Sequence, residues 1–240
     1  FDLAGEGSVE CRARLGDFCA NTTGRQHEYR TFEFPDTAGM SWAEFLKSHW
    51  NVMAATDFFT TEVWTEVWTA RGLIRYHVLF VIRLATREVR IVEIVPEPNE
   101  DWMKQIARKL TDCLDGFLKG YRYLIHDRVS QFSSSFRMIL LGGGVKTIRL
   151  PRRSPNLNAY AERWVRTAKE LCIDRMIFFG ESSLRKALSE VEIFYNRERP
   201  HQGIDNKIIL ADFDKPPTEG AIGYRSRLGG MLNYYYRKAA

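Results

Sequence analysis

Apolar and polar residues alternate along the chain in a way that predicts a β-sheet followed by alternating helices and strands. Apolar runs typical of buried strands lie within residues 50–59, 73–84 and 89–95. The second and third runs are joined by a turn at residues 85–88, which predicts a hairpin. The later elements, in chain order, are a helix over 99–119, a strand over 121–126, a helix over 131–141, a strand over 145–149, a long helix over 158–179 and a helix ending near 195.

Capping residues support several of these boundaries. Ser41 and Glu44 have the spacing of a capping box, which predicts a short helix through Phe45. Gly120 and Gly180 are expected to end the helices that precede them. A hairpin followed by alternating helices and strands implies the α/β class, with a mixed five-stranded sheet and helices on its faces.

The composition excludes several protein classes. Of the 240 residues, 45% are apolar, which is typical of a folded chain and argues against disorder. No apolar run reaches the ~18 residues that a membrane span requires, so no membrane partner is expected. The four cysteines are widely spaced and form no C-x-x-C, which argues against a disulfide scaffold or zinc site. We therefore expect a cytoplasmic protein.

Charge is distributed unevenly along the sequence. Residues 1–120 carry 14 basic and 18 acidic side chains, whereas residues 121–202 carry 15 basic and 8 acidic ones. Residues 221–240 contain four basic side chains and no acidic ones. This basic second half suggests a polyanion as partner, and the alternative is a solvated basic face without a ligand.

Three carboxylates occupy positions where sheet proteins often bind ligands. Asp57 lies near the end of the first apolar run, Asp127 directly follows the 121–126 strand, and Glu162 lies one turn into the long helix. Three converging acids without neighbouring Cys or His suit Mg²⁺ or Mn²⁺. Two such ions, roughly 4 Å apart, could clamp a phosphodiester during in-line displacement. The alternative is that each acid is a helix cap or a surface charge.

Basic residues surround the third carboxylate. Arg166 and Lys169 follow Glu162 by four and seven residues, so the three side chains share one helix face. The neighbouring Arg163 and the loop residues Arg152 and Arg153 add positive charge. This group is a candidate surface for a DNA backbone, and a Glu162–Arg166 salt bridge on the helix is the simpler interpretation.

Four sequence segments together resemble a known enzyme family. Asp57, the stretch HDRVSQF at 126–132 and the stretch RRSPNLNAYAERWV at 152–165 occur in the order found in integrase catalytic cores and bacterial DDE transposases. The stretch FYNRERPHQG at 194–203 is similar to the segment that follows the core in the insertion-sequence members, and residues 227–236 resemble their C-terminal end.

This resemblance implies a ribonuclease-H-like fold and a DNA recombinase. Asp57, Asp127 and Glu162 would be the catalytic metal triad, holding two Mg²⁺ or Mn²⁺ ions. Arg166 and Lys169 would contact the ends of the mobile element. The implied chemistry is strand cleavage followed by attack of the freed 3′-hydroxyl on target DNA. The resemblance also implies a homo-oligomer and a bacterial protein associated with the nucleoid when bound to DNA.

The sequence also departs from the family pattern. Val129 stands where many members have glycine, and residues 1–40 contain no readable DNA-recognition helices or zinc module. The interpretation divides the chain into an irregular segment at 1–40, a catalytic core at 41–205 and a basic, Tyr-rich tail at 206–240. Two alternatives stay open: a ribonuclease-H-like nuclease that does not join DNA, and a catalytically silent DNA-binding remnant.

Overall fold

A computed structural model describes residues 41–65, 72–150, 158–211 and 219–238 of the chain. The chain divides into two units, residues 1–51 and 52–240. In the first, helix α2 spans Trp42–His49. Its predicted capping box is confirmed, because the Ser41 hydroxyl accepts a hydrogen bond from the Glu44 amide at 3.3 Å while the Glu44 carboxylate accepts one from the Ser41 amide at 2.9 Å.

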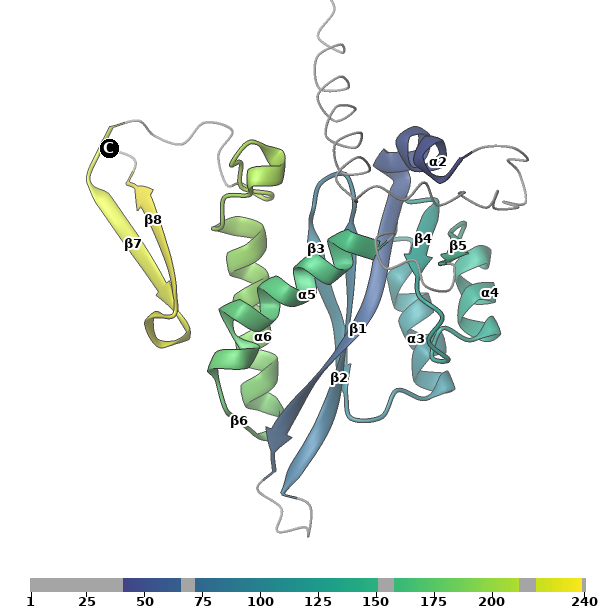
Figure 1. Cartoon of the computed structure of the whole chain (residues 1–240), viewed down its shortest axis with the longest axis horizontal. Helices are drawn as coiled ribbons and strands as arrows, with labels where there is room; N and C mark the ends of the chain where they lie inside the picture. The colour runs from purple at the N-terminus through teal and green to yellow at the C-terminus, as the bar shows by residue number, and fades with distance from the viewer. Residues whose placement is uncertain (1–40, 66–71, 151–157, 212–218, 239–240) are drawn as a thin grey trace, which may run out of the picture. The chain divides into compact units, whose positions relative to one another are not determined.

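A mixed sheet forms the centre of the second unit (Figure 1). Its five main strands run in the order β3-β2-β1-β4-β5. The β1, β2 and β3 strands form an antiparallel meander, whereas β4 and β5 lie parallel to β1. The strands are β1 (Met53–Trp64), β2 (Leu73–Arg83), β3 (Val89–Val95), β4 (Tyr123–His126) and β5 (Lys146–Arg149).

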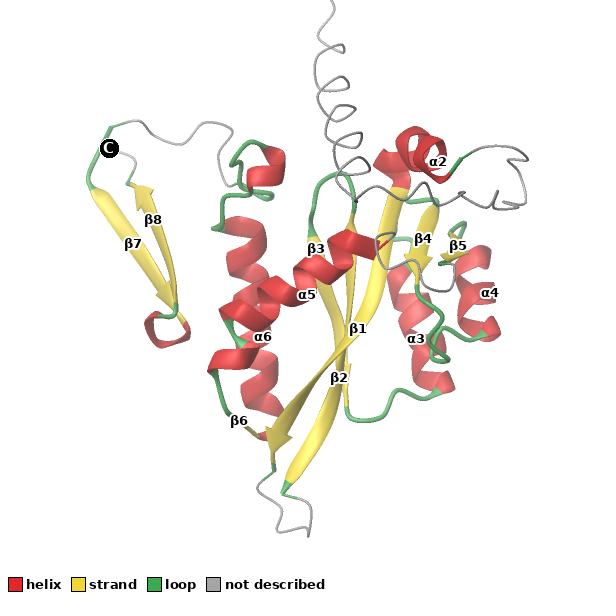
Figure 2. Cartoon of the chain, viewed as in Figure 1, coloured by secondary structure: helices red, strands yellow, loops and turns green. Residues whose placement is uncertain are grey.

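The helices lie on both faces of this sheet (Figure 2). On one face, α3 (Glu100–Leu110) and α4 (Ser134–Gly142) pack over β1, β2 and β4. On the other, α5 (Ala159–Leu171) and α6 (Gly180–Arg197) pack over β1, β2 and β3. The strand order, the strand directions and the helices on both faces confirm the predicted ribonuclease-H-like α/β fold.

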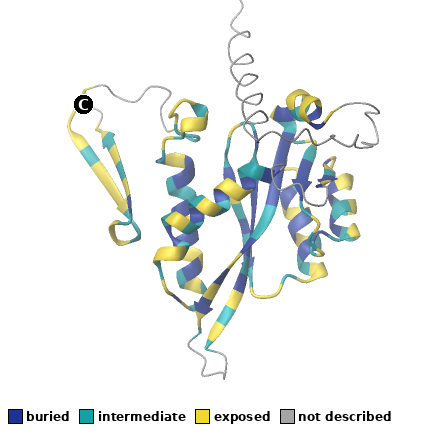
Figure 3. Cartoon of the chain, in the orientation of Figure 1, coloured by how far each residue is buried: buried dark blue, intermediate teal, exposed yellow. Residues whose placement is uncertain are grey.

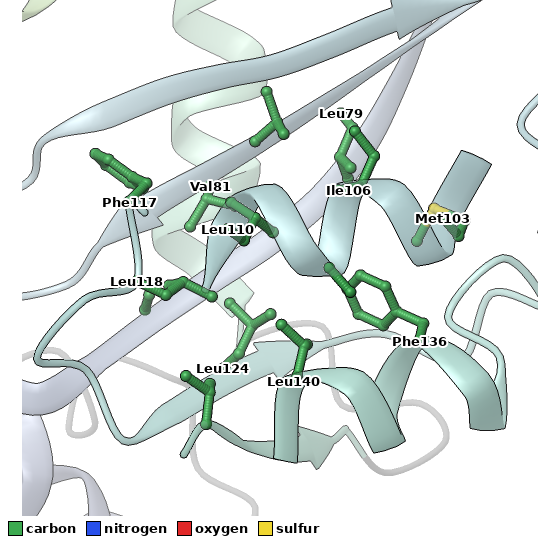
Figure 4. Close-up of a cluster of buried hydrophobic side chains, with 14 of the residues drawn as sticks. Leu79, Val81, Met103, Ile106, Leu110, Phe117, Leu118, Leu124, Phe136 and Leu140 are labelled. Carbon is green, nitrogen blue, oxygen red and sulfur yellow. The ribbon is translucent and has the colours of Figure 1, made fainter. Parts of the chain in front are cut away.

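The core under α3 and α4 is a continuous apolar layer (Figure 4). Alternate residues of the strands point toward this layer, as the two-residue period of a strand requires. Complete burial of each large apolar side chain stabilises the fold by about 1.5–3 kcal/mol. Its buried members include Ala54, Leu79, Val81, Met103, Ile106, Leu110, Leu124, Phe136 and Leu140.

Aromatic rings connect the opposite face of the sheet to α5 and α6. Phe80 of β2 lies 6.1 Å from Trp164 of α5, and Trp164 lies 4.5 Å from Tyr195 of α6, measured between ring centroids. Trp164 is almost completely buried, whereas the outer side of α5 is exposed (Figure 3). This packing fixes the position of α5 over the sheet.

Side chains of α6 cover the backbone edge of β3. Asn196 accepts a hydrogen bond from the Val89 amide at 3.0 Å and donates one to the Val89 carbonyl at 2.8 Å. Glu192 accepts from the Ile91 amide at 2.7 Å, and Arg185 donates to the Ile94 carbonyl at 2.6 Å. An edge strand would otherwise leave these groups unpaired, so α6 closes this edge of the sheet.

Two predicted helices are shorter in the structure than in the sequence interpretation. The helix expected over 99–119 ends at Leu110. Beyond it, the Asp112 carboxylate accepts a hydrogen bond from the Leu114 amide at 2.8 Å, which favours a turn over a helix. Leu114, which lies beyond the end of the helix, is 83% exposed.

The prediction of a helix over 158–179 is wrong for the last turns of that range. The α5 helix ends at Leu171, and a short 3₁₀ turn, Ile173–Arg175, follows. Phe178–Phe179 then forms β6, which pairs in parallel with Val63 and Trp64 of β1. The apolar residues of this stretch have helical spacing by chance. Phe178 is instead buried as a residue of β6, so this stretch does not form a helix.

The segment predicted as a Tyr-rich tail contains a β-hairpin that the sequence interpretation missed. Its strands are β7 (Ile222–Arg227) and β8 (Leu232–Arg237), paired antiparallel. Gly229 and Gly230 in the connecting turn have positive φ angles of 65° and 99°, which glycine adopts readily. The strand signal was hidden because β7 contains charged residues and few apolar ones.

Candidate active site

The backbone places two of the predicted carboxylates side by side. Ala55 of β1 pairs with Ile125 of the parallel strand β4. Asp57 lies two residues further along β1, and Asp127 directly follows His126, the last residue of β4. Neighbouring strands are about 5 Å apart, and residues two apart point to the same face. Ala54 and Phe58 pack in the cluster beneath α3 and α4, so Asp57 points to the opposite side of the sheet, on which α5 packs.

Short-range hydrogen bonds hold both of these aspartates. The Phe58 amide donates to Asp57 Oδ1 at 2.8 Å, and the Val129 amide donates to Asp127 Oδ1 at 3.1 Å. Each bond fixes one carboxylate oxygen and leaves the second without a hydrogen bond to a described residue. A fixed carboxylate with an unengaged oxygen is suited to bind a cation or a polar substrate group.

Glu162 lies in the first turn of α5 and is exposed. Its negative charge acts on the pKa of Asp57 in the sheet. Burial is the main cause that raises this pKa, the hydrogen bond from Phe58 acts against it, and the negative charges of Asp127 and Glu162 raise it further, to about 6. The charges of Asp127 and Glu162 thus both act on the Asp57 carboxylate.

The three carboxylates have the donor chemistry of a divalent-cation site. They are hard oxygen ligands, which Mg²⁺ and Mn²⁺ prefer. Within the ranges that the structure describes, however, no group of three or more His, Cys, Asp or Glu side chains is arranged to hold a metal ion. The predicted convergence of the three carboxylates into a metal-binding group is therefore not seen among these residues.

His126 is a neighbour of this site whose role the sequence did not reveal. Its ring is completely buried, and Nδ1 lies 2.6 Å from the carbonyl oxygen of Asp127. Burial lowers the pKa of His126 to about 4, so the ring is neutral at pH 7. Because a carbonyl can only accept, Nδ1 carries the proton and donates it. This bond fixes the backbone next to Asp127.

Val129 fits the loop after Asp127 in spite of its departure from the family pattern. Its φ angle is not in the left-handed region, so this position does not require glycine. Its side chain packs against the core cluster beneath α3 and α4. Its amide donates to Asp127, so the loop still supports the carboxylate.

The predicted DNA-binding residues divide into two groups. Arg152 and Arg153 lie outside the described residues. Arg163, Arg166 and Lys169 lie on α5, whose outer surface is exposed (Figure 3). Among the described residues no ion pair joins Glu162 to Arg166, so the structure does not support the alternative of a helical salt bridge between them.

The FYNRERPHQG stretch has a structural role that its sequence did not predict in detail. Tyr195 packs against both Trp164 and His201, with ring centroids 4.5 and 4.4 Å apart. His201 Nε2 lies 2.7 Å from the Tyr195 carbonyl oxygen, and Asn196 binds β3. The stretch thus stabilises the end of α6 that faces α5.

Comparison with known proteins finds a family match for part of this chain. Residues 143–208 match the Integrase core domain family, a stretch that contains Glu162 and the basic residues of α5. This match over part of the chain supports the predicted integrase/transposase superfamily. The sequence matches no curated protein.

Among solved structures, the chain is similar to the catalytic core domain of BIV integrase. The sequence identity is 14% and the TM-score is 0.44, over 64% of this chain and 88% of that one.

Among the described helices, none is long and apolar enough to cross a membrane.

The raised pKa of Asp57 predicts a stability effect in metal-free protein. The unfolded chain ionises this group at its ordinary pKa of 3.8, whereas the folded chain ionises it at about 6. Stability therefore falls as the pH rises from about 4 to 6, and the cost persists above that range. We expect Asp57→Asn to raise the free energy of unfolding at pH 8 by about 3 kcal/mol and to have little effect near pH 3.5.

Urea unfolding in EDTA at several pH values measures this effect. Glu97→Gln, which changes an exposed carboxylate, serves as control and should leave the free energy of unfolding almost unchanged. An Asp57→Asn variant no more stable than the parent at pH 8 would show that burial of this charge carries no cost.

Proposed function

We propose that this chain is a DNA recombinase that depends on a divalent cation. It would cleave a DNA strand at the end of a mobile element and join the freed 3′-hydroxyl to target DNA. The observation that carries this proposal is the placement of Asp57 on β1 and of Asp127 directly after β4, the parallel strand beside β1, together with the effect of Glu162 of α5 on the pKa of Asp57. The integrase core match over 143–208 supports the same reaction class.

In this proposal, the chain's own residues have separate tasks. Asp57, Asp127 and Glu162 would hold two Mg²⁺ or Mn²⁺ ions through their carboxylate oxygens. Such ions lower the pKa of an attacking water and stabilise the charge that develops on the phosphate. His126 would keep Asp127 in position through its hydrogen bond to the backbone carbonyl.

The outer surface of α5 would bind the DNA backbone. Glu162, Arg166 and Lys169 lie along one side of this helix, and Arg163 projects from the adjacent side. A backbone phosphate held by Arg166 or Lys169 would be within one or two helix turns of the carboxylates. The same helix would therefore position the scissile strand and contribute a ligand.

A joining assay tests the proposed reaction. A labelled duplex oligonucleotide with a free 3′-hydroxyl is incubated with plasmid DNA, the full chain and Mg²⁺ or Mn²⁺. Covalent transfer of the label to the plasmid supports a recombinase. Cleavage without transfer would identify a nuclease, and DNA binding with neither reaction would identify a silent remnant. Both of these results contradict the proposal.

Lys169 provides a test of the DNA surface. We expect Lys169→Ala to weaken duplex binding and to reduce the slope of log K against log salt by about 0.9, the value for one lost phosphate contact. Anisotropy titrations at several salt concentrations measure the slope. The control is Lys186→Ala, which removes an exposed lysine from α6. Equal slopes for Lys169→Ala and the parent would exclude Lys169 from the interface.

A further inference from the structure

The C-terminal hairpin has two faces with different surroundings. Directly paired residues of an antiparallel ribbon lie on the same face, and successive residues alternate. The pair Arg225 and Tyr234 and the pair Arg227 and Leu232 therefore belong to one face, called here the inner face. The outer face consists of three pairs, namely Ile222 with Arg237, Tyr224 with Tyr235, and Ser226 with Asn233.

The inner face is attached to the end of α6 by ion pairs. The Glu198 side chain is 1% exposed and accepts hydrogen bonds from Arg227 at 2.7 and 2.8 Å and from Arg225 at 2.9 Å. Burial would raise the pKa of Glu198, but these two arginines hold it below its usual value. Glu190 also pairs with Arg227, at 2.5 Å. The two inner arginines are thus matched by two carboxylates.

The outer face remains exposed and carries aromatic rings. Tyr224 and Tyr235 are each 68% exposed, and Ile222 is 69% exposed. The two tyrosine rings lie directly opposite each other, with centroids 6.2 Å apart and planes inclined by 35°. Large aromatic side chains are rarely left this exposed in pairs unless they bind a partner.

The positive charge of the outer face favours an anionic partner. Arg237 lies on the outer face, where it donates a hydrogen bond to the Gly220 carbonyl at 3.1 Å, and Lys238 follows it. Both side chains are exposed, and no acidic residue occurs between residues 221 and 240. Because the inner arginines are paired with carboxylates, Arg237 and Lys238 carry the excess positive charge of the hairpin.

We propose that the outer face of this hairpin binds single-stranded DNA, with unpaired bases stacked on Tyr224 and Tyr235 and phosphates beside Arg237 and Lys238. Exposed aromatic rings next to basic side chains are the usual means of binding single strands without sequence preference. The choice of DNA rests on the proposed function, since strand cleavage and joining produce unpaired ends. Glu198 holds the face in place relative to α6.

Binding of fluorescent oligo(dT) to the full chain in EDTA tests this proposal. We expect Tyr224→Ala and Tyr235→Ala each to weaken binding about fivefold or more, the effect of one lost stacking contact. Tyr224→Phe with Tyr235→Phe should keep parental affinity, because phenylalanine also stacks. Ser226→Ala, on the same face, is the matched control and should have no effect.

Several results would overturn the proposal. Unchanged affinity in the alanine variants would exclude the outer face, and equal loss in the phenylalanine variant would exclude stacking. Tighter binding of oligo(U) or of duplex DNA than of oligo(dT) would assign the face to another nucleic acid. The test contains no metal, so a failed joining assay would leave its result unaffected and the two proposals can fail separately.

Discussion

Asp127→Asn is expected to lower the rate of DNA strand cleavage by roughly 100- to 1,000-fold, the usual effect of removing one group that stabilises transition-state charge. Asparagine keeps an oxygen that can accept the hydrogen bond from the Val129 amide, so the loop and the fold should persist. The substitution removes the negative charge that would hold the cation. The loss should therefore appear in the rate of the chemical step and not in stability.

Single-turnover cleavage of a labelled duplex, with parent and variant at equal DNA occupancy, measures this loss. Asp174→Asn is the matched control, because Asp174 is an exposed aspartate just after α5. It should cleave at the parental rate. Cleavage by Asp127→Asn within a few fold of the parent would remove Asp127 from the catalytic group.

The second large effect concerns stability. Glu198→Ala is expected to cost the hairpin about 3 kcal/mol, because it removes the buried carboxylate that pairs with both Arg225 and Arg227. Arg227, whose side chain is only 14% exposed, would keep only the partly exposed Glu190 as its ionic partner. The hairpin should then open locally while the sheet remains folded.

Hydrogen exchange of the amides in residues 222–237 measures this opening. The expected result is faster exchange there and unchanged protection in β1 and β2. Glu190→Ala removes only a partly exposed partner of Arg227 and should cost about 1 kcal/mol or less. Equal protection of the hairpin in Glu198→Ala and the parent would show that Glu198 does not anchor it.

The sequence predicted the fold because its central strands and helices have clear hydrophobic periods. The strands at 73–84 and 89–95 and the helix capped by Ser41 are confirmed with small shifts of their ends. The errors have physical causes. Asp112 favours a turn, so α3 ends earlier than predicted. Phe178 pairs with Val63 as a strand residue, so the residues after α5 do not continue the helix.

The candidate site could be predicted only in part. Asp127 follows β4 as predicted, whereas Asp57, expected near a strand end, lies inside β1 because this strand continues to Trp64. The structure adds that β1 and β4 are parallel neighbours. The role of His126 depends on a single bond to a backbone carbonyl, which leaves no pattern in a sequence. The attachment of the hairpin could not be predicted either, since Glu198 and Arg227 are 29 residues apart in the chain.

Calorimetric titration of the full chain with Mn²⁺ and Mg²⁺ tests the central claim most directly. The account predicts that the parent binds the cation and that Asp57→Asn and Asp127→Asn both lose this binding, while Asp174→Asn retains it. Cation binding that is unchanged in both site variants would place the metal elsewhere and contradict the carboxylate site.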